Sequence, residues 1–567
     1  MRKTLFLAPL LAAASFAANA KSAKISFDTP MRKVGVVELI VQFKHAPNAT
    51  HADKILSRGG VLKSDLSLVN ALHVSMPTNR LRELADDPEV SYISPDRQLQ
   101  SSLSRAAVAV NAPYAWNLGY TGKGIAVAVV DSGIGNVDDL KNASGAFRVV
   151  YAQDFIGGGT DDQWGHGTHV AGAIGGTGKR SSAPYCKNCI DTFKGIAPNV
   201  TFVNLHALNQ NGVGTDSSVI NAINAAIQLK TKYNIRVLNL SLGRPVYESY
   251  TQDPLCQAVE KAWQAGIVVV VAAGNDGRND AAGTYGYGTI TAPANDPYVI
   301  TVGAMKTMGT GDRSDDLVAS YSSKGPTSID HVVKPDLVAP GNRMYSLLAP
   351  AGQLDNKYPQ NDVPLTAYEN TTNTALSSDY FTLSGTSMAA SVVSGGVADL
   401  LQALPSLTPD QVKAILMKTA WKNITPSSSL TVGNVTYTDQ ADVFTIGAGY
   451  LDLHAAISNT DIPPTSAGSM RSPVATYDNA CGCVHFLRDS SALWGSSAMW
   501  GSSALWGSNV FVGSQSAMWG SSALWGSSAM WGSSTNSAFS ALWGSSALWG
   551  SSSNTTESLS VTVNGEN

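Results

Sequence analysis

The run Ile125-Ala126-Val127-Ala128-Val129-Val130 decides the fold of this 567-residue chain, because it is apolar throughout. Two later runs, 236–240 and 267–273, have a similar texture. Strands without polar alternation are typical of parallel sheets, in which helices cover both faces. The pattern also predicts helices over 216–230 and 256–265. We therefore expect an α/β fold with a doubly wound, mostly parallel sheet, which would bind ligands beyond the carboxyl ends of its strands.

Three motifs place reactive side chains at the ends of such elements. Asp131 follows the first apolar run in Asp-Ser-Gly, His166 stands in Gly-His-Gly before a small-residue helix, and Ser387 begins another such helix in Gly-Thr-Ser-Met-Ala. A serine hydroxyl is a weak nucleophile that needs a base within hydrogen-bonding distance. Histidine supplies that base near neutral pH, and a buried aspartate fixes its tautomer. The three residues together predict a catalytic triad, whose small neighbours let a substrate backbone approach closely.

A fourth motif supplies a hydrogen-bond donor. Asn275 follows the third apolar run in Ala272-Ala273-Gly274-Asn275. We expect its side-chain amide, together with the backbone N–H at the start of the Ser387 helix, to stabilise a negatively charged oxygen during acyl transfer.

These motifs, their order Asp…His…Ser and the Ala-Ala-Gly-Asn segment resemble those of the subtilisin-type serine proteases. Further matching segments are Lys194-Gly195-Ile196-Ala197-Pro198, Asn239-Leu240-Ser241-Leu242-Gly243, Ser322-Ser323-Lys324-Gly325-Pro326, Lys334-Pro335-Asp336-Leu337-Val338-Ala339-Pro340-Gly341 and Gly447-Ala448-Gly449-Tyr450-Leu451. The resemblance implies a subtilisin-like peptidase domain over 106–460. In it Ser387 would be the nucleophile and His166 the general base and then acid. Asp131 would orient His166, and Asn275 would be the oxyanion donor.

The resemblance also implies where a substrate lies. Segment 241–243 matches the extended segment that pairs with substrate backbone by strand addition. With segment 272–274 it would wall a specificity pocket, whose small apolar lining predicts a preference for large hydrophobic residues before the scissile bond. Thr291 is the candidate for the pocket floor. At Ser391 the chain lacks the proline that is usual in this family, so we expect a slightly altered helix path.

The N-terminal part carries export and inhibition signals. Residues 1–20 are a predicted signal peptide, because Arg2 and Lys3 precede a short apolar run that ends in Ala-Asn-Ala. Segment 21–105 has the order strand, helix, strand, strand, helix, strand of a small α+β domain. It resembles the inhibitory propeptide of these proteases, which implies autocatalytic removal by a cut between Arg97 and Ala107. We therefore expect a secreted protein, made as a zymogen that its own propeptide inhibits.

The C-terminal part has two textures. Residues 461–489 are rich in Pro, Ser and Gly and are expected to form a linker, and 490–567 form a Trp/Ser/Gly-rich repeat tail. In that tail Ser-Ser-Ala-(Leu/Met)-Trp-Gly recurs, with tryptophans at 494, 500, 506, 519, 525, 531, 543 and 549. A period of six places the tryptophans of one uninterrupted run on the same side of an extended strand. Three interpretations stay open: contact with a cell envelope or polysaccharide, a dispensable or processed tail, and a structural repeat.

Composition limits the partners and cofactors. The net charge is −4 and only 14% of the residues are charged, so the basic footprint of a nucleic-acid-binding protein is missing. Protein and peptide substrates are the expected partners. The predicted chemistry requires no cofactor. Loop carboxylates could bind structural calcium, but the sequence has no strict ligand loop that would identify such a site. Structural calcium therefore stays an open alternative.

Other reactive residue types have plainer interpretations. Among the five cysteines, the Cys186-x-x-Cys189 pair allows a small disulfide loop in an oxidising compartment, and its spacing also allows redox chemistry or half of a zinc site. Cys256 is expected in the core. His169 is expected to be a structural helix residue rather than a metal ligand. The Asp161-Asp162 pair is expected to be a solvated part of a loop rather than catalytic.

Two other functions compete with an active endopeptidase. One is a catalytically idle scaffold that binds a surface through its tryptophan-rich tail, which lost catalytic residues would favour. The other is a serine hydrolase such as an esterase. The motif order and the lack of a Gly-x-Ser-x-Gly elbow around Ser387 exclude that class.

Overall fold

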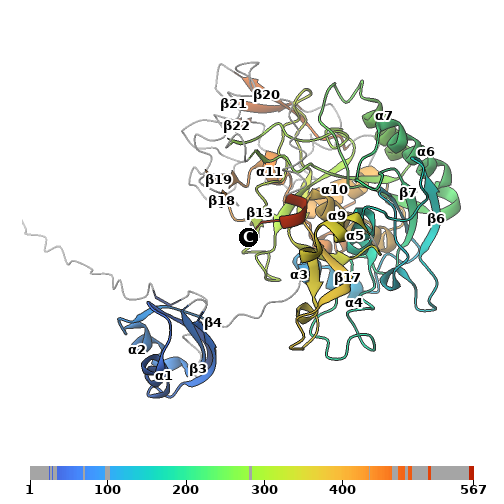
Figure 1. Ribbon diagram of the computed structural model, residues 1–567. Helices are drawn as coiled ribbons and strands as arrows, with labels where there is room; N and C mark the ends of the chain where they lie inside the picture. Colours follow the sequence, from blue (N-terminus) through green and yellow to red (C-terminus); the bar gives the residue numbers. More distant parts are fainter. Residues whose placement is uncertain are drawn as a thin grey trace, which may run out of the picture. The chain divides into compact units, whose positions relative to one another are not determined.

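The computed structural model forms two compact units, Met1–Leu99 and Gln100–Asn567 (Figure 1). It describes residues 24–25, 29, 35–67, 70–95, 102–279, 284–350, 352–432, 435–462, 470–478, 483–487, 509–511 and 561–566. The predicted signal peptide at 1–20 and the tryptophans of the hexapeptide repeat lie outside the described residues. None of the helices in the described part of the chain has the length and apolar composition that a bilayer crossing requires.

The first unit is a four-stranded sheet with two helices. Its elements are β1 (Val36–Phe43), α1 (Ala49–Leu56), β2 (Val61–Leu66), β3 (Ala71–Pro77), α2 (Leu81–Ala85) and β4 (Val90–Pro95), with a 3₁₀ turn at Thr78–Arg80. The strand order is β2-β3-β1-β4, and each neighbouring pair is antiparallel. Alternate residues Leu39, Val41 and Phe43 are buried, so one face of β1 packs against the unit's own core. The order of elements is the one that the sequence predicts.

The second unit is built on an eight-stranded sheet. Its strands run in the order β13 (Leu317–Val318), β12 (Ile300–Lys306), β9 (Val268–Ala272), β8 (Ile235–Leu240), β5 (Ala126–Asp131), β7 (Thr201–His206) and β6 (Val149–Asp154), and β14 (Leu337–Pro340) also pairs with β12. All of these pairs are parallel except β12–β13. The predicted doubly wound, mostly parallel sheet is confirmed.

Helices cover both faces of this sheet. Every residue of β5, β9 and β12 is buried, which matches the apolar side chains that most of their positions carry. Helices α5 (His166–Gly175) and α9 (Thr386–Ala403) pack against each other and the sheet, and α6 (Asp216–Tyr233) and α7 (Pro254–Gln264) form a second such pair. Because strands buried on both sides need two helix layers, the two pairs account for the two layers.

The remaining elements of the second unit surround this framework. They are α3 (Ser102–Ala109), α4 (Ala112–Asn117), β10 (Arg278–Asn279), β11 (Thr284–Tyr285), β15 (Met344–Leu347), α8 (Gln353–Lys357), β16 (Asp362–Pro364), β17 (Leu376–Leu383), α10 (Pro409–Thr419), β18 (Ser427–Val432), β19 (Val435–Gln440), α11 (Val443–Ile446) and α12 (Leu453–Ile457), with 3₁₀ turns at Asp138–Leu140, Pro359–Asn361 and Leu365–Ala367. Cys186 and Cys189 form a disulfide, a pairing that the sequence left open, and Cys256 is buried without one.

The strand order changes direction at β5, and this position locates the site. After β5 the chain forms β6 and β7 on one side, then β8, β9 and β12 on the other. Ligands of such sheets bind outside the carboxyl ends of the strands at this switch point. Asp131 is the last residue of β5, and β8 and β9 end next to segments 241–243 and 273–275. Asp131 and the segments 241–243 and 273–275 therefore lie at the carboxyl ends of neighbouring parallel strands.

The interpretation of 461–489 as a linker is incomplete, because it contains two strands that pair with each other. Strands β20 (Val474–Asp478) and β21 (Cys483–Leu487) pair with each other, and β22 (Asn509–Phe511) pairs with β21. Just before β20, the Ser472 backbone N–H donates to the Pro297 carbonyl at 2.8 Å. The Ser472 hydroxyl donates to Asp336 Oδ1 at 2.6 Å.

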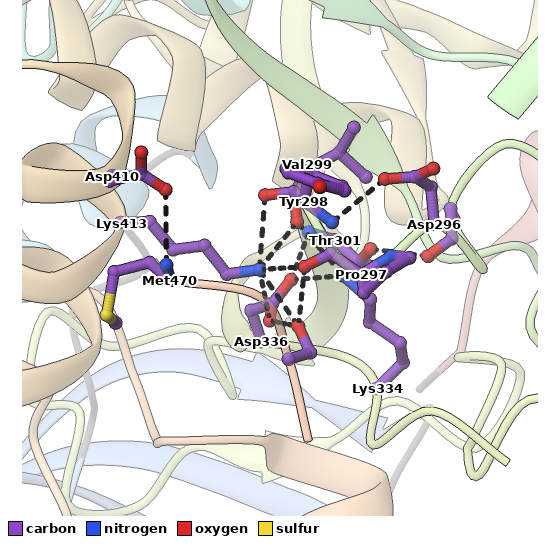
Figure 2. A network of polar contacts seen from close by, with 12 residues as sticks. Asp296, Pro297, Tyr298, Val299, Thr301, Lys334, Asp336, Asp410, Lys413 and Met470 are labelled. Atoms are coloured by element: carbon purple, nitrogen blue, oxygen red, sulfur yellow. Dashed lines mark hydrogen bonds and ion pairs between the residues drawn. The ribbon is translucent and has the colours of Figure 1, made fainter. Parts of the chain in front are cut away.

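Asp336 lies at the centre of a buried network that explains this ordering (Figure 2). Its carboxylate contacts Lys334 Nζ at 2.7 Å and Lys413 Nζ at 3.1 Å, and Lys413 also donates to the carbonyls of Pro297 and Val299. Burial alone would raise the pKa of Asp336, but the two lysines outweigh it and lower that pKa. Buried charges are tolerated only with such partners. The network fixes Ser472, so the folded region extends beyond residue 460.

Candidate active site

Asp131 and His166 form a buried pair at the switch point. His166 is the first residue of α5, and its Nδ1 lies 2.8 Å from Asp131 Oδ1. The exposed fraction is 8% for His166 and 1% for Asp131. Burial lowers the pKa of His166, but the charge and hydrogen bond of Asp131 outweigh burial, and the pKa is raised. Because Nδ1 donates to the carboxylate, Nε2 is left as the basic nitrogen.

The glycine after His166 is required for packing. A Cβ at Gly167 would lie 2.2 Å from the carbonyl oxygen of Gly133, two residues after Asp131. Only glycine lets the start of α5 approach the end of β5 this closely. We predicted that small residues here make room for substrate. At Gly167, by contrast, the small residue brings the carboxylate and imidazole motifs together.

Asp162 is not a solvated loop residue, so that prediction was wrong for it. Its exposed fraction is 4%, whereas the neighbouring Asp161 is exposed. Its carboxylate accepts from the backbone N–H groups of Gly165 at 2.7 Å and Thr168 at 2.7 Å, and from the Ser132 hydroxyl at 2.8 Å. Asp162 thus caps the helix that begins with His166. The N-cap residue of α5 is Gly165, so the usual start signal of a helix did not mark Asp162.

Ser387 lies in the first turn of α9, which packs against α5. It is half-buried, and its hydroxyl donates to the Ser241 carbonyl at 3.2 Å. The Ser241 hydroxyl donates in return to the Ser387 carbonyl at 2.9 Å. In this structure the hydroxyl of the candidate nucleophile is therefore hydrogen-bonded to Ser241, the first residue of the predicted substrate segment, rather than to the imidazole. Catalytic hydrogen bonds often form only with substrate present.

Asn275 lies against the turn that precedes Ser387. Its Oδ1 accepts from the backbone N–H of Thr386 at 2.9 Å and from the Thr386 hydroxyl at 3.0 Å. A Cβ at Gly385 would lie 3.1 Å from Asn275 Nδ2, so the amide nitrogen is beside that glycine. The oxygen end of the amide is fixed, which directs its donor end toward the start of the Ser387 helix. The role of Thr386 in holding Asn275 had no signal in the sequence.

The two predicted walls of the substrate pocket meet at Thr291. A Cβ at Gly243 would lie 2.4 Å from Thr291 Oγ1, and one at Gly274 would lie 2.8 Å from Thr291 Cγ2. The Thr291 backbone N–H donates to the Ala273 carbonyl at 3.1 Å. Ala272 and Ala273 are both buried. The structure thus brings 241–243, 272–274 and Thr291 together.

Ser391 occupies the position where the family pattern has proline. Its side chain is fully buried, and its hydroxyl donates to the Ser387 carbonyl at 2.8 Å, one turn earlier in α9. Serine hydroxyls commonly bond to the carbonyl four residues before them in a helix. The helix runs from Thr386 to Ala403 as a single element.

His169 is fully buried, and its ring contacts backbone carbonyl groups. His169 Nε2 contacts the carbonyls of Met344 at 3.0 Å and Phe381 at 3.1 Å, and burial lowers its pKa to about 3. A neutral histidine that donates to backbone oxygens fits the predicted structural role. Within the ranges that the structure describes, no three His, Cys, Asp or Glu side chains gather as metal ligands. The calcium alternative therefore has no candidate cluster of acidic side chains there.

Comparisons with known proteins agree with this geometry. The model of the family described as "Subtilase family" matches residues 122–449. Serine protease AprX of Bacillus subtilis is 33% identical over 71% of this chain and 87% of its own length. Subtilisin E of the same species is 31% identical over 67% of this chain and 84% of its own length. The extracellular serine proteinase of a Thermus species is 33% identical over 62% and 71% of the two chains.

Proposed function

Since this chain belongs to the subtilase family of serine endopeptidases, we propose that Asp131, His166 and Ser387 are the triad with which it hydrolyses peptide bonds. The observation that carries the proposal is the buried 2.8 Å contact between Asp131 and His166 at the carboxyl end of β5. It presents a basic Nε2 beside the helix that begins with the Ser387 turn.

The proposed reaction follows from these positions. The Ser387 hydroxyl turns from the Ser241 carbonyl, attacks the scissile carbonyl carbon and passes its proton to His166 Nε2. Asp131 stabilises the imidazolium that forms. His166 then protonates the leaving amine, which departs and leaves an acyl-enzyme. A water molecule, deprotonated by His166, attacks the acyl carbon, and His166 then gives that proton to the Ser387 oxygen as the acyl group leaves as an acid.

Asn275 is proposed as the oxyanion donor, because its amide nitrogen lies beside Gly385. Asn275→Ala should reduce kcat by about 10²–10³-fold with a smaller effect on KM, a magnitude known from subtilisin itself. Steady-state kinetics on a chromogenic peptide would measure this. Thr386→Val is the matched control, because it removes one bond to Asn275 Oδ1 but keeps the donor. An equal loss of kcat in the two variants would show that Asn275 only positions the Ser387 turn and does not act as the oxyanion donor.

The pH dependence of kcat/KM should report His166, which must be neutral to accept a proton. Its pKa is raised above the ordinary histidine value, so activity should fall as pH decreases through a midpoint above that value. The Asp162 charge contributes to this rise. Asp162→Asn keeps one of the two accepting oxygens and removes the charge. Loss of the charge destabilises the imidazolium and should move the midpoint to lower pH. The exposed-site variant Asp312→Asn is the control. A midpoint that stays fixed or rises in Asp162→Asn would contradict this assignment.

Segment 241–243 is proposed to bind substrate backbone as an added strand. In the described part of the chain, no backbone hydrogen bond occupies Leu242 or Gly243. Arg244 holds the end of the segment through Asp216 at 2.9 Å and Asp253 at 2.9 Å. We expect the pocket around Thr291 to favour a large hydrophobic residue before the scissile bond.

The first unit is proposed to be an inhibitory propeptide of a secreted zymogen. Its independence as a compact unit supports this, as does the word "extracellular" in the name of the Thermus relative. Helix α3 belongs to the second unit, and its residues Arg105, Ala106 and Ala107 are buried. A cut within α3 would break a packed helix, so we propose a cut between Arg97 and Ser102 instead of a boundary at residue 105.

Mass spectrometry of the exported protein tests this processing. Wild type should lack the first unit, whereas Ser387→Ala should retain it as an uncleaved precursor. Identical N termini in the two proteins would rule out autocatalytic removal. Deletion of 490–550 tests the proposed contact of the tail with a cell envelope or polysaccharide. Unchanged surface retention would discard that role.

A further inference from the structure

The last described residues of the chain, 561–566, lie in the second unit as part of its packed structure (Figure 1). They form a single helical turn at 561–564 followed by Gly565 and Glu566. The side chains of Val561, Val563 and Glu566 are buried, with exposed fractions of 3%, 4% and 4%. This segment, which we call the C-terminal clip, follows a long low-complexity region with no pattern that predicts a packed element.

The Glu566 carboxylate fills a pocket built from buried cations. Its Oε1 contacts Arg278 Nη1 and the Ser320 hydroxyl. Its Oε2 lies 3.2 Å from Lys306 Nζ and accepts from the Ser320 backbone N–H at 3.1 Å. The side chains of Arg278 and Lys306 are only 7% and 4% exposed. Two buried cations require a nearby negative charge, and the clip supplies it.

Side chains also bind the backbone of the clip as they would bind a peptide ligand. Asn342 donates to the Glu566 carbonyl at 2.8 Å and accepts from the Glu566 N–H at 2.8 Å. Asn361 donates to the Val563 carbonyl. Gly565 has φ of 62°, and a Cβ there would lie 2.4 Å from Ser384 Oγ. The site therefore selects a short peptide with glycine before glutamate.

The clip also contacts the turn that carries the proposed nucleophile. The Ser384 backbone N–H donates to the Thr562 carbonyl at 2.8 Å, and the Ser384 hydroxyl accepts from the Arg343 N–H at 2.9 Å. Ser384 is three residues before Ser387. Asn275 holds the same turn at Thr386. The turn is thus held at Ser384 by the clip and at Thr386 by the oxyanion donor.

We propose that the C-terminal clip is a built-in peptide ligand, whose carboxylate occupies a site formed by Arg278, Lys306 and Ser320, and that it positions the Ser384–Ser387 turn. The occupant is segment 561–566 of the same chain. The positioning role rests on the proposed function of Ser387, whereas binding at the site does not. Stability and peptide binding therefore test the site separately from activity.

The experiment compares the full chain with Glu566→Gln and with a chain that ends at Ser560. The control is Asp461→Asn, which breaks the exposed pair of Asp461 and Lys418. Loss of a buried charge partner should lower Tm by about 5 °C or more, and a loosened turn should lower kcat by about tenfold or more. Exposed pairs contribute little, so the control should change neither.

A synthetic peptide with the sequence of 561–567 completes the test. Added to the shortened chain, it should bind, as measured by calorimetry, and restore Tm and kcat, whereas the peptide with glutamine at 566 should not. If the shortened chain is not recovered folded, the Tm and kcat of the full-length Glu566→Gln variant test the proposal. An unchanged Tm in Glu566→Gln, or equal binding of the two peptides, overturns the site.

Two further outcomes separate the parts of the proposal. Restored activity on mixing the shortened chain with full-length Ser387→Ala would show that a second copy supplies the clip, and would overturn the same-chain assignment. A lowered Tm with unchanged kcat would keep the site but overturn its positioning role. Failure of the triad proposal would appear instead as retained activity in Ser387→Ala.

Discussion

Replacing Ser387 with alanine should reduce kcat for peptide hydrolysis by about a millionfold, the magnitude known from subtilisin itself. The hydroxyl is the only protein group in the proposed mechanism that forms a bond to the substrate carbon. Its removal costs the folded protein one 3.2 Å hydrogen bond to the Ser241 carbonyl, so the fold should survive. Digestion of casein and kinetics on a chromogenic peptide would measure the loss.

A matched serine variant makes this result specific. Ser394 lies in the same helix, and its hydroxyl donates to Asn239 Oδ1 at 2.8 Å. Ser394→Ala should retain most of the activity, because this hydroxyl does not take part in the proposed reaction. Wild-type activity in Ser387→Ala would end the assignment of Ser387 as nucleophile.

Asp131→Asn should reduce kcat by about ten-thousandfold. The Asp131 carboxylate accepts the Nδ1 proton of His166 at 2.8 Å, which leaves Nε2 basic. An asparagine amide in the same place can donate to Nδ1, and the proton then moves to Nε2, where it blocks the base. The loss should appear in kcat rather than in KM.

The control for this prediction is another buried carboxylate. Asp316 accepts from the Tyr450 hydroxyl at 2.6 Å and takes no part in the proposed reaction. Asp316→Asn should affect Tm more than kcat. Comparable kcat losses in Asp131→Asn and Asp316→Asn would indicate a general effect on folding instead of a specific effect on the imidazole.

Local patterns predicted the fold and the Asp131–His166 pair. Continuous apolar runs identify buried parallel strands, and β5, β8 and β9 lie within one residue of the predicted runs. Glycine and small residues after Asp131 and around His166 indicate that these two segments of the backbone approach each other closely. Helix ends were less accurate: α6 continues to Tyr233, beyond the predicted end at 230.

Features that depend on distant partners could not be read from the sequence. Asp161 and Asp162 have the same side chain, and only the fold shows that one is exposed while the other caps α5. Ser472 lies in a segment of linker composition, and Asp336, which orders it, is 136 positions away. Glu566 and Arg278 are 288 positions apart. No local pattern marks such pairs.

The idle-scaffold alternative loses its main support from these observations. That interpretation expects lost catalytic residues or a broken site. Asp131 and His166 remain paired, and Asn275 remains held at the Ser387 turn. The tail can bind a surface without the peptidase being inactive, so a surface role does not revive the idle-scaffold interpretation.

Labelling with a fluorophosphonate most directly tests the claim that Ser387 is a serine activated by His166. The reagent reacts with activated serine hydroxyls, and peptide mapping by mass spectrometry locates the adduct. We predict one adduct on the peptide that contains Ser387, lost in Ser387→Ala and formed much more slowly in His166→Ala. An adduct on a different serine, or equal labelling of Ser387→Ala, would contradict the account.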